Sequence, residues 1–264
     1  MKISVLTDNC PGGQTPAEHG LSYLIECDGK RILFDTGQSN MFMKNAEAMN
    51  ISLTKLDMII LSHGHFDHGN GLNYLSGYSL LCHPGCFVNR YRKADRHYIG
   101  LKNTKSELSG KFELITSKKP YQISENIFFL GEIPRLTDFE SQTTSFVYED
   151  GTPDYVLDDS AVAIILSDGL FIVTGCGHAG IVNTLEHAKK VTGLNIINGI
   201  MGGFHLKEIN MQTKETIRYL KESKLKHVFP SHCTDLPALS AFYESFHCQF
   251  VRTGNIYNFT SSNI

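Results

Sequence analysis

The chain has 264 residues, of which 41% are hydrophobic and 19% are charged, and its formal net charge is −3. This composition predicts a globular protein with a sizeable core, and its charge gives no attraction to nucleic acid or to an anionic membrane. The seven cysteines are scattered without CxxC spacing, no apolar run is long enough to cross a bilayer, and no signal-peptide pattern is visible. We therefore expect a cytoplasmic protein that acts on a small molecule, with no indication of its oligomeric state.

The first part of the chain reads as short strands followed by helices. A hairpin turn is expected at Asp28-Gly29, because this dipeptide suits a two-residue turn between strands. The expected strands are Lys2–Thr7, Ser22–Glu26, Arg31–Asp35, Lys55–Leu61 and Ser79–Cys82. Helices are expected over Asn40–Asn50 and from Gly69 to Leu75.

Residues 85 to about 110 interrupt this pattern with basic side chains interleaved with tyrosines, and we expect an irregular capping excursion there. Its basic residues either recognise a phosphate or form a solvated surface; they include Arg90, Arg92, Lys93 and Arg96. Strands resume after it, at Phe112–Thr116, Ile127–Leu130, Ala161–Leu166 and Leu170–Thr174.

The last third alternates helices with strands. Helices are expected over Gly180–Val191, Thr213–Ser223 and Leu236–Phe246. Strands are expected at Asn195–Ile200 and His227–Pro230, with a final strand pair within Phe250–Phe259. The alternation predicts an α/β protein, and both halves run from a hairpin to alternating units. We therefore expect two related mixed sheets packed face to face with helices outside, in one domain spanning residues 1–264.

The stretch LSHGHFDHGNG follows a predicted buried strand and has the pattern H-x-H-x-D-H. In a turn after the strand, His63 and His65 can face one point, while Asp67 and His68 face another. Neutral imidazole and carboxylate suit zinc, iron or manganese. Four ligands this close would be strained around one ion, so we expect two divalent ions, zinc foremost, about 3.5–4 Å apart and sharing a bridging water.

Two downstream segments place a histidine just after an apolar strand, where sites of open α/β sheets gather. His178 in FIVTGCGHAG and His232 in HVFPSHCT are therefore expected to complete the metal site. Cys176 is either a further ligand or a small residue of a tight turn, and Cys233 is expected to point into the core.

Two more histidines are candidates for the active site. His205 in IMGGFHL ends a predicted strand; it would bind substrate, donate a proton, or lie near the surface. His19 lies on the loop after the first strand, between Glu18 and Gly20, and is a candidate substrate-binding residue. His83 is a weaker candidate at the end of another strand.

These motifs, together with FDTG at 34–37 and PSHC at 230–233, resemble the metallo-β-lactamase superfamily. The resemblance implies an αβ/βα four-layer sandwich with a di-metal centre at the edge between the sheets. It implies that the first ion is held by His63, His65 and His178. It implies that the second is held by Asp67, His68 and His232. Asp35 would brace the metal loop through hydrogen bonds.

The chain departs from the common pattern of that superfamily at one position. Cys176 stands where an aspartate usually bridges the two ions. The bridge is then water alone, Cys176, Asp158 or Asp159, and the sequence does not choose among them.

A finer resemblance rests on AEHGLS, FDTGQ, GCxHAG and GGFHL. These motifs are similar to 7,8-dihydropterin-6-yl-methyl-4-(β-D-ribofuranosyl)aminobenzene 5′-phosphate synthase-like proteins, a family whose name implies a pterin pyrophosphate and a ribosyl phosphate as substrates. The segment GEIPR matches this family too, which makes Arg135 a candidate substrate-binding residue.

Three functions follow as hypotheses. The first is a di-metal hydrolase, in which Asp67 orients a hydroxide, His205 protonates the leaving group, and Arg90 and Arg92 recognise a phosphate. The second is a transferase that joins a dihydropterin pyrophosphate to an aminobenzene ribosyl phosphate at the same centre. The third, a di-iron redox carrier or a binding module, is disfavoured because the H-x-H-x-D-H pattern is intact.

Overall fold

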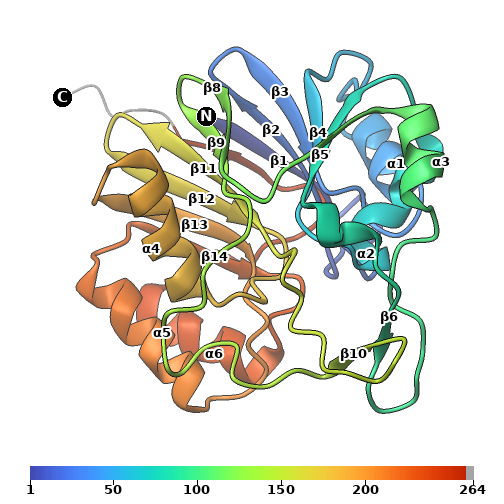
Figure 1. The fold of residues 1–264 in the computed structure, drawn as a ribbon. Helices are drawn as coiled ribbons and strands as arrows, with labels where there is room; N and C mark the ends of the chain where they lie inside the picture. Colours follow the sequence, from blue (N-terminus) through green and yellow to red (C-terminus); the bar gives the residue numbers. More distant parts are fainter. Residues whose placement is uncertain (260–264) are drawn as a thin grey trace.

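The computed structural model describes residues 1–259. Two large mixed sheets lie face to face, and helices cover the outer face of each (Figure 1). The expected αβ/βα sandwich is therefore confirmed. None of the helices in the described range is long and apolar enough to cross a membrane.

The first sheet has seven strands in the order β15-β1-β2-β3-β4-β5-β7. Its members are β1 (Lys2–Thr7), β2 (Ser22–Cys27), β3 (Lys30–Phe34), β4 (Met58–Leu61), β5 (Ser79–Cys82), β7 (Glu113–Thr116) and β15 (Ile256–Asn258). β1, β2 and β3 are antiparallel neighbours, whereas β3, β4, β5 and β7 run parallel. Asp28 and Gly29 form the β2–β3 turn with φ of 54° and 68°, as the hairpin prediction required.

The second sheet has six strands in the order β14-β13-β12-β11-β9-β8. Its members are β8 (Tyr121–Ser124), β9 (Ile127–Phe129), β11 (Ala161–Leu166), β12 (Gly169–Thr174), β13 (Ile197–Gly203) and β14 (His227–Ser231). β8, β9, β11 and β12 are antiparallel neighbours, whereas β12, β13 and β14 are parallel. Both sheets thus pass from an antiparallel to a parallel half, as the sequence indicated.

Three apolar clusters hold the layers together. Side chains such as Phe34, Phe129 and Phe171 fill the space between the sheets. A second cluster joins the second sheet to α4 (Ile181–Thr192), α5 (Met211–Glu222) and α6 (Leu236–Phe246). A third packs the first sheet against α1 (Met41–Ala48), the 3-10 helix η1 (Asn70–Tyr74) and α3 (Lys105–Lys111), and the short helix α2 (Phe66–Gly69) directly precedes η1.

Several elements differ from the prediction. The expected helix from Gly69 begins earlier, as α2, and continues as the 3-10 helix η1. The capping excursion contains the 3-10 helix η2 (Pro84–Phe87), β6 (Arg90–Arg92) and α3, and β6 pairs with β10 (Phe146–Tyr148). The prediction of a final strand pair was wrong. β15 pairs with β1, but residues 253 and 254 form backbone hydrogen bonds to Cys10 and Val5 instead of forming a strand.

Candidate metal centre

The predicted metal-binding residues meet at one edge of the sandwich, where parallel strands end. His63 and His65 follow β4, and α2 carries Asp67 and His68. Cys176 and His178 lie between β12 and α4, and His232 lies between β14 and α6. Chain segments that leave parallel strands at their carboxyl ends converge, which explains why residues so far apart in sequence share one site.

The loop after β4 has no room for a side chain at position 64. A Cβ at Gly64 would lie 2.0 Å from the backbone oxygen of Cys86, so only glycine fits between the two histidines. The Gly64 N–H donates to Asp158 Oδ2 at 2.7 Å. His205 and His232 have positive φ, at 48° and 51°, a conformation that costs a non-glycine residue free energy and often marks functional sites.

The first donor group consists of His63, His65 and His178, whose ligand atoms lie within 4.8 Å of one another. His63 Nε2 is 2.9 Å from His65 Nδ1. The buried Nε2 of His178 has no hydrogen-bond partner. Imidazole nitrogens that converge in a buried space fit a cation, because each neutral ring offers a lone pair.

The second donor group surrounds Asp67. His68 Nε2 and His232 Nε2 are 3.0 Å apart, and His232 Nε2 is 3.4 Å from Asp67 Oδ2. The exposed His19, a predicted substrate-binding residue, joins this group, with Nε2 3.1 Å from Asp67 Oδ2. These atoms form an N/O donor set of the kind that binds zinc.

Hydrogen-bond partners outside the donor groups hold His63, His68 and His232 with Nε2 toward the centre. Asp35 Oδ2 lies 2.7 Å from His68 Nδ1 and also accepts the Ser62 hydroxyl at 2.7 Å. Since Ser62 gives its proton to Asp35, it accepts from His63 Nδ1 at 2.9 Å, which leaves His63 Nε2 with its lone pair. Asn9 Oδ1 lies 3.0 Å from His232 Nδ1 in the same way. This is the arrangement in which metal-binding histidines are usually held.

Cys176 lies between the two donor groups. Its Sγ is 3.1 Å from His68 Nε2 and groups with both His63 and His68. The other two candidate bridges are engaged elsewhere: Asp158 bonds to Gly64, and Asp159 Oδ2 accepts the Ala179 N–H at 2.8 Å. Neither aspartate belongs to a donor group within residues 1–259.

Cys233 lies beside the centre, although we expected it to point into the core. Its Sγ is 3.5 Å from the Cys176 backbone oxygen, and it forms a third donor group with Cys176 and His205. The sequence carried one signal for this position, namely that Cys233 directly follows the candidate ligand His232.

Burial and neighbouring charges divide the histidines into two kinds. Burial lowers the pKa of His63 and His178 well below the usual value and that of His65 to about 3. Burial opposes charge on His68 and His232 too, but nearby carboxylates, Asp35 and Asp67 for His68 and Asp67 for His232, raise their pKa. The first group therefore consists of neutral imidazoles at physiological pH, the form that binds metal.

Asp67 itself stays ionised. Burial would raise the pKa of its carboxyl group, but His68, His19 and His232 outweigh burial and hold this pKa well below its usual value. An ionised carboxylate enclosed by imidazoles contributes negative charge to the second donor group, which favours a divalent cation there.

The predicted arginines do not meet at the centre. Arg90 is buried, with Nη2 2.7 Å from Asp158 Oδ1 and Nε 3.3 Å from Asp154 Oδ2. This burial corrects the expectation that Arg90 recognises a substrate phosphate, because it instead fixes the aspartate that holds Gly64. Arg92 is exposed and pairs with Asp95, three residues away.

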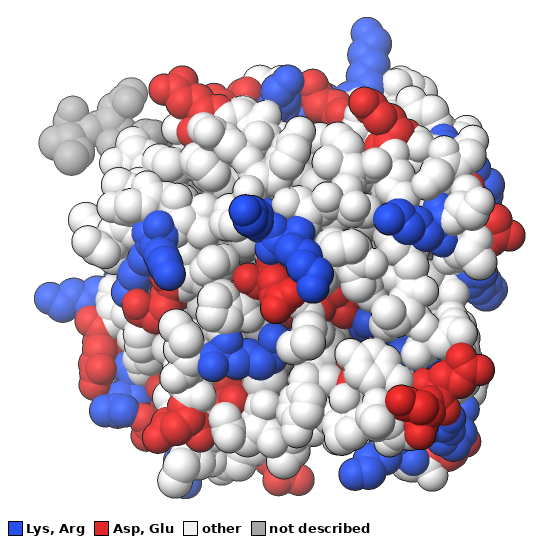
Figure 2. Space-filling model, viewed as in Figure 1, with Lys and Arg blue, Asp and Glu red and all other residues white. Residues whose placement is uncertain are grey.

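Arg135 is likewise held by hydrogen bonds to other residues of the fold. Its guanidinium donates to Ser141 Oγ and to the backbone oxygens of Tyr155 and Val156. The contacts hold the loop that forms one wall of a cavity. Basic and acidic side chains are otherwise interspersed over the face shown in Figure 2.

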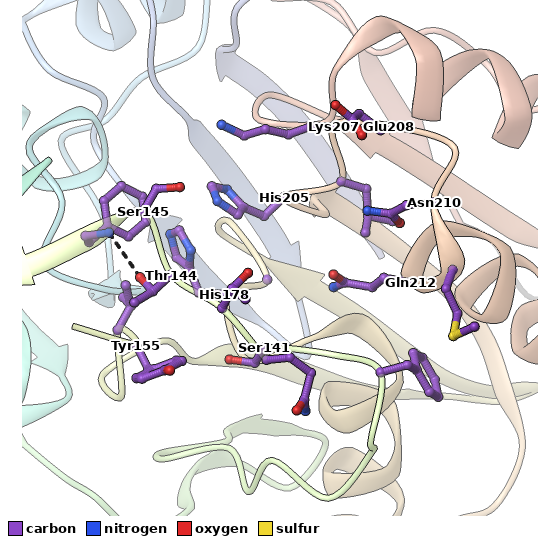
Figure 3. A pocket seen from close by; sticks show the side chains of 18 residues that line it. Ser141, Thr144, Ser145, Tyr155, His178, His205, Lys207, Glu208, Asn210 and Gln212 are labelled. Atoms are coloured by element: carbon purple, nitrogen blue, oxygen red, sulfur yellow. Dashed lines mark hydrogen bonds between the residues drawn. The ribbon is translucent and has the colours of Figure 1, made fainter. Parts of the chain in front are cut away.

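This cavity, of about 460 Å³, opens beside the first donor group (Figure 3). His178 and His205 line it, with ring centroids 4.3 Å apart, and Phe146 packs against both rings. Its volume lies within the range of small-molecule sites. The centre is therefore open to a small substrate from the side of His178.

Comparison with known proteins agrees with this fold. The sequence model of the metallo-beta-lactamase superfamily matches residues 15–79. A solved structure described as a metal-dependent hydrolase of the beta-lactamase superfamily superposes with a TM-score of 0.88 at 28% identity, over 99% of this chain and 100% of the other. The chain belongs to the metallo-β-lactamase superfamily.

Two relatives come from Methanocaldococcus jannaschii. One, named 7,8-dihydropterin-6-methyl-4-(beta-D-ribofuranosyl)-aminobenzene-5'-phosphate synthase, is 34% identical over 96% of this chain and 94% of its own length. The other, described as uncharacterized, is 33% identical over 96% of this chain and 98% of its own length. The resemblance inferred from the short motifs therefore extends along nearly the whole sequence.

Proposed function

We propose that the chain is a hydrolase that works with two divalent metal ions, zinc foremost, and acts on a small phosphorylated substrate. The observation that carries the proposal is the pair of donor groups, held by hydrogen-bond partners outside them and placed beside a cavity of ligand size. In this proposal His63, His65 and His178 hold the first ion. Asp67, His68 and His232 hold the second, and Cys176 lies where it offers a donor to both.

The bound ions would supply Lewis acidity and lower the pKa of a water molecule. Asp67 Oδ2 is the carboxylate oxygen best placed to orient that water, and His19 Nε2, 3.1 Å away, fixes its direction. As the water oxygen bonds to phosphorus, the water releases one proton to the solvent and the ester P–O bond breaks. The departing oxygen then needs a proton. His205 lines the cavity next to His178 and gives that proton to the leaving alcohol.

A transferase is the second candidate, favoured by the relative that is named as a synthase. The same residues would then hold the ions, and an aromatic acceptor in the cavity would replace water as the nucleophile. The acceptor would bond to carbon while the pyrophosphate of a dihydropterin leaves. Incubation of both substrates with the metal-loaded protein separates the candidates, since only a transferase forms the joined product.

Elemental analysis after metal reconstitution tests the proposal, with His65→Ala beside the wild type. We expect about two ions per chain in the wild type, partial loss in the variant, and parallel loss of phosphoester hydrolysis. His97→Ala is the matched control, because His97 is exposed on the capping excursion. A wild type without divalent metal, or a His65→Ala variant with full metal and full activity, would overturn the proposal.

A further inference from the structure

The cavity beside the first donor group has an uneven distribution of charge. Hydroxyl and amide side chains from residues 141–145 form one wall, and residues 205–212 form the other. Apart from its histidines, its charged lining residues within the described chain are Lys207 and Glu208. The two charged side chains point apart in Figure 3: the side chain of Lys207 points toward the side of the cavity where the His205 ring lies, whereas the side chain of Glu208 lies on the side away from it.

Lys207 differs from the arginines that the sequence suggested for phosphate recognition. Its side chain is exposed and has no ion pair or hydrogen bond to any residue of the described chain. Arg90 and Arg135 are both engaged by other residues of the fold, and Arg92 is engaged by Asp95. Among residues 1–259, the cation that lines this cavity and is free to meet a ligand is therefore Lys207.

We infer that Lys207 binds a phosphoryl oxygen of the substrate and thereby selects phosphorylated molecules over neutral esters. The inference rests on the proposed function and deepens it, because it names the residue that selects the class of substrate. A terminal phosphate has three non-bridging oxygens and carries up to two negative charges, so it gains from a further cation outside the donor groups. An ammonium group on a flexible stem suits this task, because it can approach such an oxygen from several directions.

The rest of the cavity lining favours an anion that carries an organic group. Phe146 and Tyr155 line the cavity, and Phe146 already packs against the His65, His178 and His205 rings. The cavity is much larger than inorganic phosphate requires. An aryl phosphate places its phosphate near Lys207 and its ring against these side chains, which makes 4-nitrophenyl phosphate a suitable probe.

The test compares Lys207→Met and Lys207→Arg with the wild type, all loaded with zinc. Lys214→Met is the matched control, because Lys214 lies exposed on α5 and does not line the cavity. Hydrolysis is measured with 4-nitrophenyl phosphate and with the neutral ester 4-nitrophenyl acetate. Binding of inorganic phosphate is measured separately by calorimetry, and zinc content confirms that each variant keeps its ions.

For Lys207→Met we expect about a ten- to hundredfold fall in both phosphoester kcat/KM and phosphate affinity, the usual effect of losing one charge-assisted hydrogen bond. The neutral ester should change less than about twofold, and Lys207→Arg should recover most of the loss. Equal losses on both esters, or unchanged phosphate affinity, would overturn the role of Lys207. If the wild type hydrolyses neither ester, the proposed function fails, while the phosphate measurement still decides the inference.

Discussion

Asp35→Asn should weaken metal binding although Asp35 belongs to neither donor group. The carboxylate is fully buried. Its Oδ1 accepts the Ser62 N–H at 2.7 Å, and its Oδ2 receives both the Ser62 hydroxyl and His68 Nδ1 at 2.7 Å. Through Ser62 it also orients His63, so one side chain aligns a histidine of each donor group.

The expected magnitude follows from these contacts. An amide nitrogen at the Oδ2 position accepts neither proton, so two hydrogen bonds to a charged group are lost, each contributing about 1.5–3 kcal/mol. The metal-free protein should therefore lose about 3 kcal/mol or more of its free energy of unfolding. Loss of an outer partner typically lowers metal affinity ten- to hundredfold, about 1.4–2.7 kcal/mol, and we expect a loss in that range.

Competition with a chromogenic chelator measures the metal affinity, and urea unfolding of the metal-free protein measures stability. Asp57→Asn is the control, because Asp57 is exposed and pairs with Lys30 at the surface. That variant should change stability by less than about 1 kcal/mol and leave metal affinity unaltered. If Asp35→Asn binds zinc as tightly as the wild type, the outer carboxylate does not orient the ligands, and our reasoning about this site is wrong.

Three further predictions concern the supports of the site. Burial raises the pKa of Asp159 to about 7. The free energy of unfolding therefore falls as the pH rises from 3.8 through about 7, because the unfolded chain ionises this carboxyl group more readily than the folded protein does. Unfolding of the metal-free protein should show Asp159→Asn about 4 kcal/mol more stable than the wild type at pH 8.5, with no gain below pH 4; parallel pH curves would contradict this. Gly64→Ala should lose about 1–3 kcal/mol in denaturant unfolding, because its Cβ meets a backbone oxygen of η2, whereas Gly110→Ala, with open space around it, should gain slightly. Arg90→Met leaves two buried carboxylates unpaired and should lose about 3–5 kcal/mol, against less than about 1 for the exposed Arg92→Met; similar losses would show that burial of Arg90 is not decisive.

Much of the fold could be read from local pattern. Short apolar runs, the Asp28-Gly29 turn and the later alternation of helices with strands predicted two mixed sheets, each passing from a hairpin to alternating units, although the edge strand β8 was not predicted. The pattern failed where elements are short or depend on distant partners. The three-residue strands β6 and β10 pair with each other across more than fifty residues. β6 reads Arg-Tyr-Arg and has no apolar run, and the apolar run of β10, Phe-Val-Tyr, is too short to distinguish a strand from a loop.

The donor residues were predictable because metal ligands need particular side chains at particular spacings. His63, His65, Asp67 and His68 lie in one turn, and His178 and His232 each follow an apolar strand. Their residue types and their positions at strand ends suffice to suggest a common site, since parallel strands end at the same edge of a sheet.

The roles of the remaining residues were decided by tertiary contacts. Arg90 looks like any surface arginine in the sequence, yet Asp158, 68 residues away, holds it in the interior. Asn9 reaches His232 across 223 residues, and Cys233 meets Cys176 across 57. Local spacing therefore determined which residues are candidate metal ligands. Only the packing of the two sheets decided which distant side chains orient those ligands, because such contacts depend on how the layers are brought together.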